Sequence, residues 1–232
     1  MSTNILQNKS VFISRKIGNT SIFNKLVTEY DISLNATSLI NIVQIPFSYT
    51  PKTDWIFFTS KNAINFFFAQ NPEISDFVKY GVISDSSADE LKLHKKEAHF
   101  IGKGTDLLKI AKSFRETLGN ASVLFPQAMD SMQTIQKQLA FSNTTYNLYT
   151  YKTIIRTDIN VPYADILVFT SPSNVTAYYN QYKPDNRQII VGMGNSTKYR
   201  LSEFGIKSVL VPAEFSEYGL YKCITDISPK EI

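Results

Sequence analysis

The sequence predicts an α/β protein built from two copies of one strand–helix unit. Residues 58–64, Phe-Thr-Ser-Lys-Asn-Ala-Ile, and residues 169–175, Phe-Thr-Ser-Pro-Ser-Asn-Val, are near copies. Two further pairs repeat at almost the same offset: Ser10-Val-Phe-Ile with Ser122-Val-Leu-Phe, and Ser84-Asp-Ser-Ser87 with Gly194-Asn-Ser-Thr197. Three pairs at nearly one spacing favour a duplication in which both copies carry the same kind of turn.

Short apolar runs alternate with helical patterns along the chain. Most runs are continuously apolar, as in strands buried on both faces of a parallel sheet. We expect strands at residues 11–14, 39–47, 55–59, 81–84, 98–102, 123–126, 148–155, 166–170, 188–192 and 208–212. Helical spacing is found over 22–30 and 107–118, with Thr105 as a candidate N-cap and Gly119 as a candidate stop for the second helix. This alternation predicts βαβ units.

Two extended runs interrupt the alternation, at residues 39–49 and 146–155, and both are rich in β-branched or aromatic residues. We interpret them as strands that cross between two domains. The first domain is expected to combine residues 1–45 with 156–232, and the second to be contiguous over 50–145. The linker strands are then placed at 44–49 and 146–155.

The composition, with 43% hydrophobic and 13% aromatic residues, is that of a soluble globular protein. A net charge of +4 with scattered lysines indicates no nucleic-acid partner. The lone Cys223 is better explained as a core residue than as a nucleophile. No secretory signal and no apolar run of about 18 residues is found, so a cytoplasmic protein without membrane contact is expected. We assume a monomer.

The paired Thr-Ser turns are the strongest local signal for a binding site. Ser60 and Ser171 each follow an apolar strand and can cap the next helix, whose free N–H groups would attract a carboxylate or phosphate. The alternative is that both serines are only caps. The Gly194–Thr197 turn repeats the arrangement, with Ser84 and Ser87 at the matching positions of the other copy.

Other kinds of site have little support in the sequence. His94 and His99 lack neighbours at metal-ligand spacing, and neither nucleotide-binding glycine motifs nor a nucleophile elbow occurs. Tyr151 could present its hydroxyl as a hydrogen-bond donor or weak acid, although most tyrosines are structural. Arg15 ends the first strand, where ligands of open α/β sheets bind, and an arginine there suits a carboxylate.

The chain resembles the uroporphyrinogen-III synthase family. The resemblance rests on the order and spacing of Ile56–Ile64, Val123-Leu-Phe-Pro126, Tyr151-Lys-Thr153, Phe169-Thr-Ser-Pro-Ser173 and Gly194-Asn-Ser-Thr197, which together cover nearly the whole chain. It implies two flavodoxin-like parallel-sheet domains joined by a two-stranded β ladder. It also implies that hydroxymethylbilane, a linear tetrapyrrole with eight carboxylates, is closed to uroporphyrinogen III in an interdomain cleft. Water is lost, the terminal pyrrole is inverted, and neither a metal nor an organic cofactor is implied.

The resemblance assigns Tyr151 a role in the departure of the hydroxyl or in orienting the reacting end, and it places Ser171 and Thr197 in the cleft. Ser60 and Ser87 are their counterparts in the other domain. With the neighbouring turn residues, the full set expected to bind substrate is Arg15, Ser60, Lys61, Ser84, Ser87, Gln127, Ser171, Pro172, Ser173, Gly194, Ser196 and Thr197. Two departures from the family pattern are the missing glycine and threonine in the Ser84–Ser87 turn, and Gln127 at a position where arginine is frequent.

Two other functions fit a two-domain protein of this kind. One is a non-catalytic protein that closes on an anionic small molecule. The other is a glycosyltransferase-like enzyme that binds a sugar nucleotide, although the glycine motif and an acidic partner for the ribose are missing.

Overall fold

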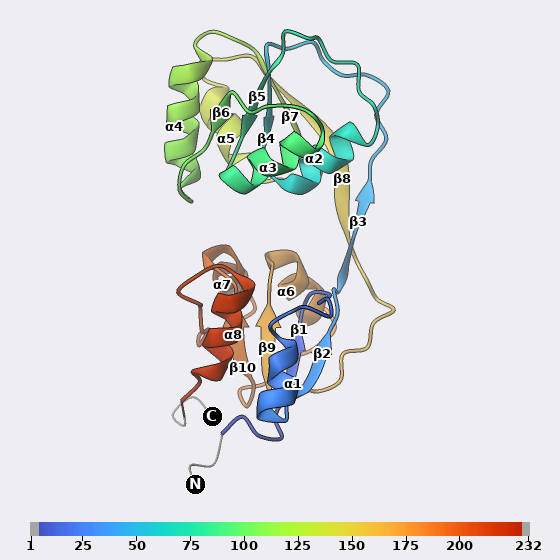
Figure 1. Ribbon diagram of the computed structural model, residues 1–232, viewed down its shortest axis with the longest axis vertical. Coiled ribbons are helices and arrows are strands. Elements are labelled where there is room, and N and C mark those ends of the chain that lie inside the picture. The colour runs from blue at the N-terminus through green and yellow to red at the C-terminus, as the bar shows by residue number, and fades with distance from the viewer. Residues whose placement is uncertain (1–4, 229–232) are drawn as a thin grey trace. The chain divides into compact units, whose positions relative to one another are not determined.

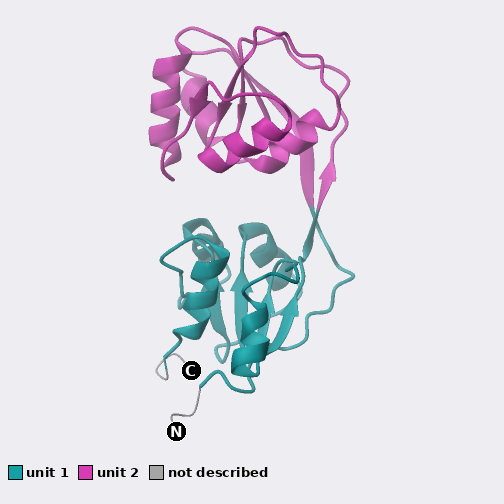
Figure 2. Cartoon of the chain, viewed as in Figure 1, with its two compact units in different colours: residues 1–41, 154–232 teal, residues 42–153 magenta. Residues whose placement is uncertain are grey.

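The computed structural model describes residues 5–228, and the chain divides into two compact units (Figure 2). Unit 1 contains residues 1–41 and 154–232, and unit 2 contains residues 42–153. The chain crosses between them through β3 (Ile40–Gln44) and β8 (Thr145–Ile155), which are neighbours in one sheet (Figure 1). The observed β3 overlaps the predicted linker strand 44–49 only at Gln44. It ends before Ile45-Pro46, since proline has no N–H for a strand ladder.

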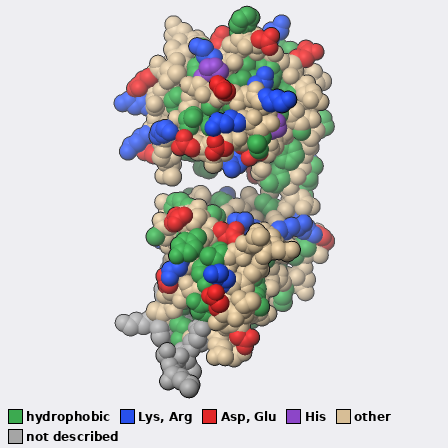
Figure 3. Space-filling view, viewed as in Figure 1, with side chains coloured by type: hydrophobic (Ala, Val, Ile, Leu, Met, Phe, Trp, Pro, Cys, Tyr) green, Lys and Arg blue, Asp and Glu red, His purple; other side chains and the backbone are tan. Residues whose placement is uncertain are grey.

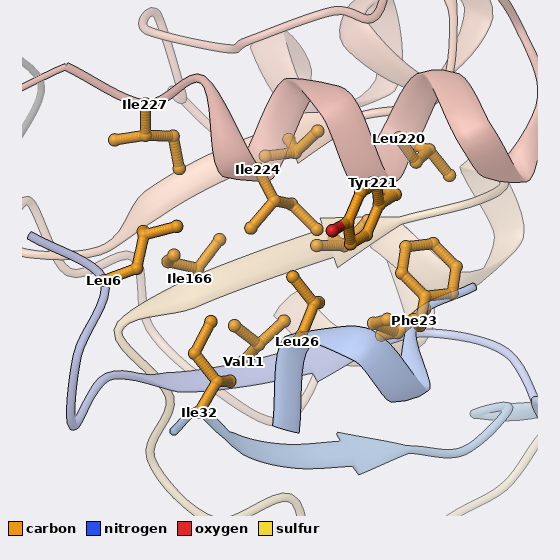
Figure 4. Packing of buried hydrophobic residues seen from close by; sticks show 13 residues of the cluster. Leu6, Val11, Phe23, Leu26, Ile32, Ile166, Leu220, Tyr221, Ile224 and Ile227 are labelled. Atoms are coloured by element: carbon orange, nitrogen blue, oxygen red, sulfur yellow. The ribbon is translucent and has the colours of Figure 1, made fainter. Parts of the chain in front are cut away.

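Unit 1 contains a four-stranded parallel sheet in the order β10-β9-β1-β2. Its strands are β1 (Ser10–Ile13), β2 (Ser33–Ala36), β9 (Ile166–Phe169) and β10 (Ile189–Gly192). Its helices are α1 (Asn24–Tyr30), α6 (Pro172–Tyr179), α7 (Asn195–Glu203) and α8 (Glu217–Thr225). Side chains alternate across the sheet. Val11 packs with α1 and α8 (Figure 4), and Phe12 on the other face packs with α6 and α7.

Unit 2 contains a six-stranded sheet in the order β3-β8-β7-β4-β5-β6. Besides β3 and β8, its strands are β4 (Trp55–Phe58), β5 (Lys79–Val82), β6 (Phe100–Ile101) and β7 (Val123–Ala128). Its helices are α2 (Lys61–Phe68), α3 (Asp85–Leu93), α4 (Leu107–Leu118) and α5 (Thr134–Leu139). Phe58 belongs to the core cluster beneath α2 and α3, and Phe57 belongs to the cluster beneath α4 and α5. The α/β prediction is confirmed.

Three local predictions were wrong. The sequence pattern missed β2, because this partly exposed strand at the edge of the sheet lacks a continuous apolar run. Residues 208–212 do not form a named strand, since only Leu210 makes a bridge, to Val191, before Pro212 ends the run. Helix α4 is capped by Asp106 instead of Thr105, because the Asp106 carboxylate accepts two N–H groups of the first turn. The predicted stop at Gly119 is confirmed by its φ of 57°.

The duplication is visible in a serine–aspartate contact that occurs once in each unit. In unit 1, the Asp165 carboxylate accepts hydrogen bonds from the Ser10 N–H (2.8 Å) and hydroxyl (2.7 Å), and the Asp165 N–H donates to Ser10 Oγ (3.0 Å). In unit 2, Asp54 accepts from the Ser122 N–H (2.8 Å) and hydroxyl (2.7 Å), and its own N–H donates to Ser122 Oγ (3.1 Å). We call these two contacts the clasps.

Each clasp lies directly before two paired strands, and the register of that pair is equivalent in the two units. Val11 lies opposite Ile166 in unit 1, and Val123 lies opposite Trp55 in unit 2. Ser10 and Ser122 begin one repeated segment, while Asp54 and Asp165 begin the other. Each unit therefore combines the first segment of one copy with the second segment of the other copy.

Replacing Asp165 by asparagine is expected to lower the free energy of unfolding by about 1 kcal/mol at pH 7, because hydrogen bonds to a charged acceptor are stronger than neutral ones. Burial acts to raise the pKa of Asp165, but the hydrogen bonds from Ser10 and the charge of Lys9 outweigh it, so this pKa is lowered. A lowered pKa in the folded state stabilises folding above the unfolded value of about 3.9, and that stabilisation is lost as the pH falls further.

Urea unfolding between pH 7 and pH 3 tests this prediction. The difference between wild type and Asp165→Asn should be present at pH 7 and should shrink below about pH 4. Asp89→Asn is a suitable control, since Asp89 is an exposed residue of α3 whose ion pair with Lys92 contributes little. An equal loss of stability at every pH would contradict the role given to the charge of Asp165.

Candidate functional site

In each unit, two neighbouring strands end directly before the N-termini of two helices (Figure 1). Strands β9 and β10 pair in parallel and lead into α6 and α7, while β4 and β5 pair in parallel and lead into α2 and α3. Helix α6 packs against α7, and α2 packs against α3. Each unit thus has two adjacent helix N-termini at the carboxyl edge of its sheet, the edge where α/β proteins bind ligands. We call the first turns of these helices the rim of the unit.

The N-cap residues confirm the predicted turns. The hydroxyl oxygens of Ser60, Ser84 and Ser171 accept hydrogen bonds from the backbone N–H three residues ahead, at 3.1, 3.4 and 3.3 Å. Gly194 caps α7 without a side chain, so no capping side chain occupies the N–H groups of that turn. The other N–H groups at the start of each helix have no intrahelical acceptor, and they lie at the positive end of the helix dipole. Such groups bind carboxylates and phosphates.

Tyr151 lies at the rim of unit 2. Its hydroxyl oxygen is 3.1 Å from Ser60 Oγ, and its ring stacks on Phe66 of α2 with centroids 5.3 Å apart. The side chain is only 8% exposed. Burial raises the pKa of Tyr151, the hydrogen bond with Ser60 opposes this, and the charge of Asp130 adds to the increase. The phenol therefore keeps its proton at neutral pH and can donate a hydrogen bond.

The remaining residues of the two rims differ in accessibility. Lys61 begins α2 and is exposed, and within residues 5–228 it has no ion-pair partner. Ser196 is also exposed, whereas Pro172 and Ser173 in the first turn of α6 are partly exposed. The side chains of Ser87 and Thr197 are buried. At these two positions a ligand would therefore meet the backbone of the helix turn before it could reach the side-chain hydroxyl.

Two residues that were predicted to bind substrate already form hydrogen bonds or an ion pair within the protein. Gln127 is 1% exposed and its amide contacts Asn147 at 2.9 Å and Gln136 at 2.5 Å, so it supports the end of β7 from inside and has no surface for a ligand. Arg15 lies beyond the end of β1, and its guanidinium is 3.3 Å from Glu217 in the first turn of α8. A carboxylate ligand at Arg15 would have to compete with Glu217.

Asn174, a buried polar residue at the rim of unit 1, was not predicted from the sequence. Its amide nitrogen donates to Ser171 Oγ at 3.0 Å, and its amide oxygen accepts from the Leu39 N–H at 2.8 Å. In the repeat, residues 58–64 and 169–175 place Ala63 at the position of Asn174. The neighbouring pairs Lys61/Pro172 and Asn62/Ser173 also differ, so the repeat alone did not single out Asn174.

No group of three or more histidine, cysteine, aspartate or glutamate side chains that could hold a metal ion occurs in the described residues. The helices within residues 5–228 are also too short or too polar to cross a membrane.

Comparison with known proteins identifies one family. A family model described as uroporphyrinogen-III synthase HemD matches residues 33–222. The structure is similar to that of a uroporphyrinogen-III synthetase from Helicobacter pylori, with a TM-score of 0.69 and 19% identity, over 94% of this chain and 97% of that chain. It is also similar to a mutant uroporphyrinogen III synthase from the extremely thermophilic bacterium Thermus thermophilus, with a TM-score of 0.61 and 14% identity, over 94% of this chain and 100% of that chain. No curated protein matches significantly.

Proposed function

Because the chain belongs to the uroporphyrinogen-III synthase family, whose members are cyclising lyases of tetrapyrrole biosynthesis, we propose that its two rims bind the carboxylates of hydroxymethylbilane. The enzyme closes this linear tetrapyrrole to uroporphyrinogen III, with loss of water and inversion of the terminal ring. The observation that carries the proposal is the repeated placement of two adjacent helix N-termini at the carboxyl edge of each sheet. Eight carboxylates need many donors, and these turns supply them.

The arginines support a binding mode that depends on backbone N–H groups. The chain has only five arginines. Four of them form ion pairs within the protein and the fifth donates to a backbone carbonyl, as follows: Arg15 with Glu217, Arg156 with Asp158, Arg187 with Asp185, Arg200 with Glu203, and Arg115 with the carbonyl of Gln138. On the face shown in Figure 3, basic and acidic side chains are interspersed instead of forming a basic patch. Every arginine thus already has a partner within the protein, whereas the first N–H groups of the rim helices have no intrahelical acceptor.

Tyr151 is proposed to assist the loss of water. The hydroxyl of hydroxymethylbilane departs as water only if it gains a proton, and the buried phenol of Tyr151 is protonated at neutral pH. A phenol with a raised pKa is a weak acid, so a hydrogen bond to the departing oxygen is the contribution expected from it. The larger task is conformational, because hydroxymethylbilane closes spontaneously to the type I isomer. Holding the carboxylates at fixed points selects the folded substrate that gives type III.

The expectation that substrate binds between the two domains stays a prediction, as do the predicted domain boundaries. Each rim by itself supplies N–H donors for carboxylates.

Separation of the product isomers tests the function. Freshly generated hydroxymethylbilane is supplied to the chain, the products are oxidised, and the type I and type III isomers are resolved by chromatography. We expect mainly type III with the native chain, and type I with the heat-inactivated chain. Type I alone in both samples would contradict the enzymatic function. Tight binding of the substrate without cyclisation would favour the non-catalytic binding protein.

A further inference from the structure

We infer that Asn174 is a positioning residue that makes the Ser171 hydroxyl a hydrogen-bond donor to a substrate carboxylate, an inference that rests on the proposed function. A serine hydroxyl has one proton to donate and two lone pairs to accept hydrogen bonds. At Ser171 Oγ, both accepting positions are filled from Asn174, by its backbone N–H at 3.3 Å and by its side-chain amide at 3.0 Å. The Ser171 proton must therefore point away from Asn174.

The direction of these hydrogen bonds is fixed by a third contact. The side-chain oxygen of Asn174 accepts from the Leu39 N–H at 2.8 Å, and Asn174 is only 4% exposed. If the amide were rotated by half a turn, its NH₂ group would face the Leu39 N–H and two donors would be opposed. The observed orientation is the one in which both the amide oxygen and the amide nitrogen have partners. In the described part of the chain, no protein acceptor is found for the Ser171 hydroxyl proton.

The chemistry of the turn favours a carboxylate as the acceptor. Pro172 occupies the first position of α6 and has no N–H, so this helix offers one backbone donor fewer than α2. The Ser171 hydroxyl compensates for that missing donor. Together with the Ser173 N–H it provides two donors at the positive end of a helix, an arrangement that suits the two oxygens of one carboxylate.

In the corresponding turn of unit 2, the capping serine has a different second hydrogen-bond partner. Ala63 stands where Asn174 stands in unit 1, and Ser60 has the phenol of Tyr151 as its second partner, at 3.1 Å. The serine of unit 2 is thus linked to a group that can supply a proton. The serine of unit 1 is linked to an amide that cannot, so Ser171 binds and orients substrate without taking part in proton transfer.

Asn174→Asp tests the inference, because it replaces the side-chain donor to Ser171 Oγ by an acceptor with little change in shape. Aspartate still accepts from the Leu39 N–H, but its second oxygen accepts from Ser171 and turns the hydroxyl proton inward. We expect KM for hydroxymethylbilane to rise about tenfold or more, as for the loss of one hydrogen bond to a charged group, with kcat nearly unchanged. Asn180→Asp, the same chemical change at the exposed end of α6, should leave KM unchanged.

A second variant, Ser171→Ala, keeps the contact between Asn174 and Leu39 and should raise KM by a similar factor. In the double variant the two effects should not add, because Asn174 acts through Ser171. A wild-type KM for either single variant, or full additivity in the double variant, would overturn the inference. Failure of the wild-type chain to form type III product would instead overturn the proposed function, so the two failures are distinguishable.

Discussion

Replacing Tyr151 by phenylalanine is expected to slow the formation of uroporphyrinogen III by a factor of about 10² while leaving the fold intact. The phenylalanine ring preserves the stacking on Phe66 and the packing in the core of unit 2, so only the hydroxyl is lost. Ser60 keeps its capping hydrogen bond from the Ala63 N–H, so helix α2 should begin at the same residue. The change therefore removes the donor to the departing oxygen and little else.

Steady-state kinetics with the isomer assay checks this prediction. The decrease should appear in kcat, with KM changed by less than about twofold, because the interaction is made mainly in the transition state. Tyr149→Phe is the matched control in the same strand, since Tyr149 is exposed and its hydroxyl only accepts a long hydrogen bond from Gln133 at 3.4 Å. An unchanged kcat for Tyr151→Phe would remove Tyr151 from the mechanism.

The largest effect on stability is expected from Gly219→Ala, which should lower the free energy of unfolding by about 3 kcal/mol. In an unobstructed helix the same change would stabilise by about 1 kcal/mol. Here an added Cβ would overlap the backbone oxygen of Glu214 and lie 2.9 Å from the carbonyl carbon of that residue. Helix α8 would have to move away from that turn, and Leu220 and Ile224 would then lose contacts in the core of unit 1 (Figure 4).

Chemical denaturation of Gly219→Ala and Gly18→Ala separates the steric effect from the general effect of replacing glycine. No atom lies within 4 Å of a Cβ added at Gly18, and its φ is not positive, so that variant should be neutral or slightly stabilised. Equal stability of the two variants would contradict the close approach of α8 to the Glu214 turn.

Several parts of this structure could be predicted from the sequence because they depend on local chemistry. An apolar strand followed by serine predicts a capped helix, and Ser60, Ser84 and Ser171 all cap one. Glycine after a periodic helix predicts a stop, and Gly119 has the expected positive φ. The repeat also identified the turns that form the rims, since both copies carry similar residues at the same strand ends.

The parts that could not be predicted depend on long-range contacts. Thr105 and Asp106 are both good N-cap residues, and nothing local distinguishes them. Asn174 is held by Leu39, which lies far away in the sequence, so its role appears only in the folded unit. The clasps likewise join Ser10 to Asp165 and Ser122 to Asp54. Their four residues stand at repeat-related positions, but each clasp joins one segment from each copy, and local patterns do not show that exchange.

The most direct test of carboxylate binding by the rims is an NMR titration of the ¹⁵N-labelled enzyme with uroporphyrinogen III under reducing conditions. The backbone amides of Asn62 and Ser86 report on the rim of unit 2, and those of Ser173 and Ser196 report on the rim of unit 1. We predict saturable shifts at both rims. The amide of Ser122, at the opposite edge of its sheet, should not move. Shifts confined to that opposite edge, or absent from both rims, would contradict binding by the helix N-termini.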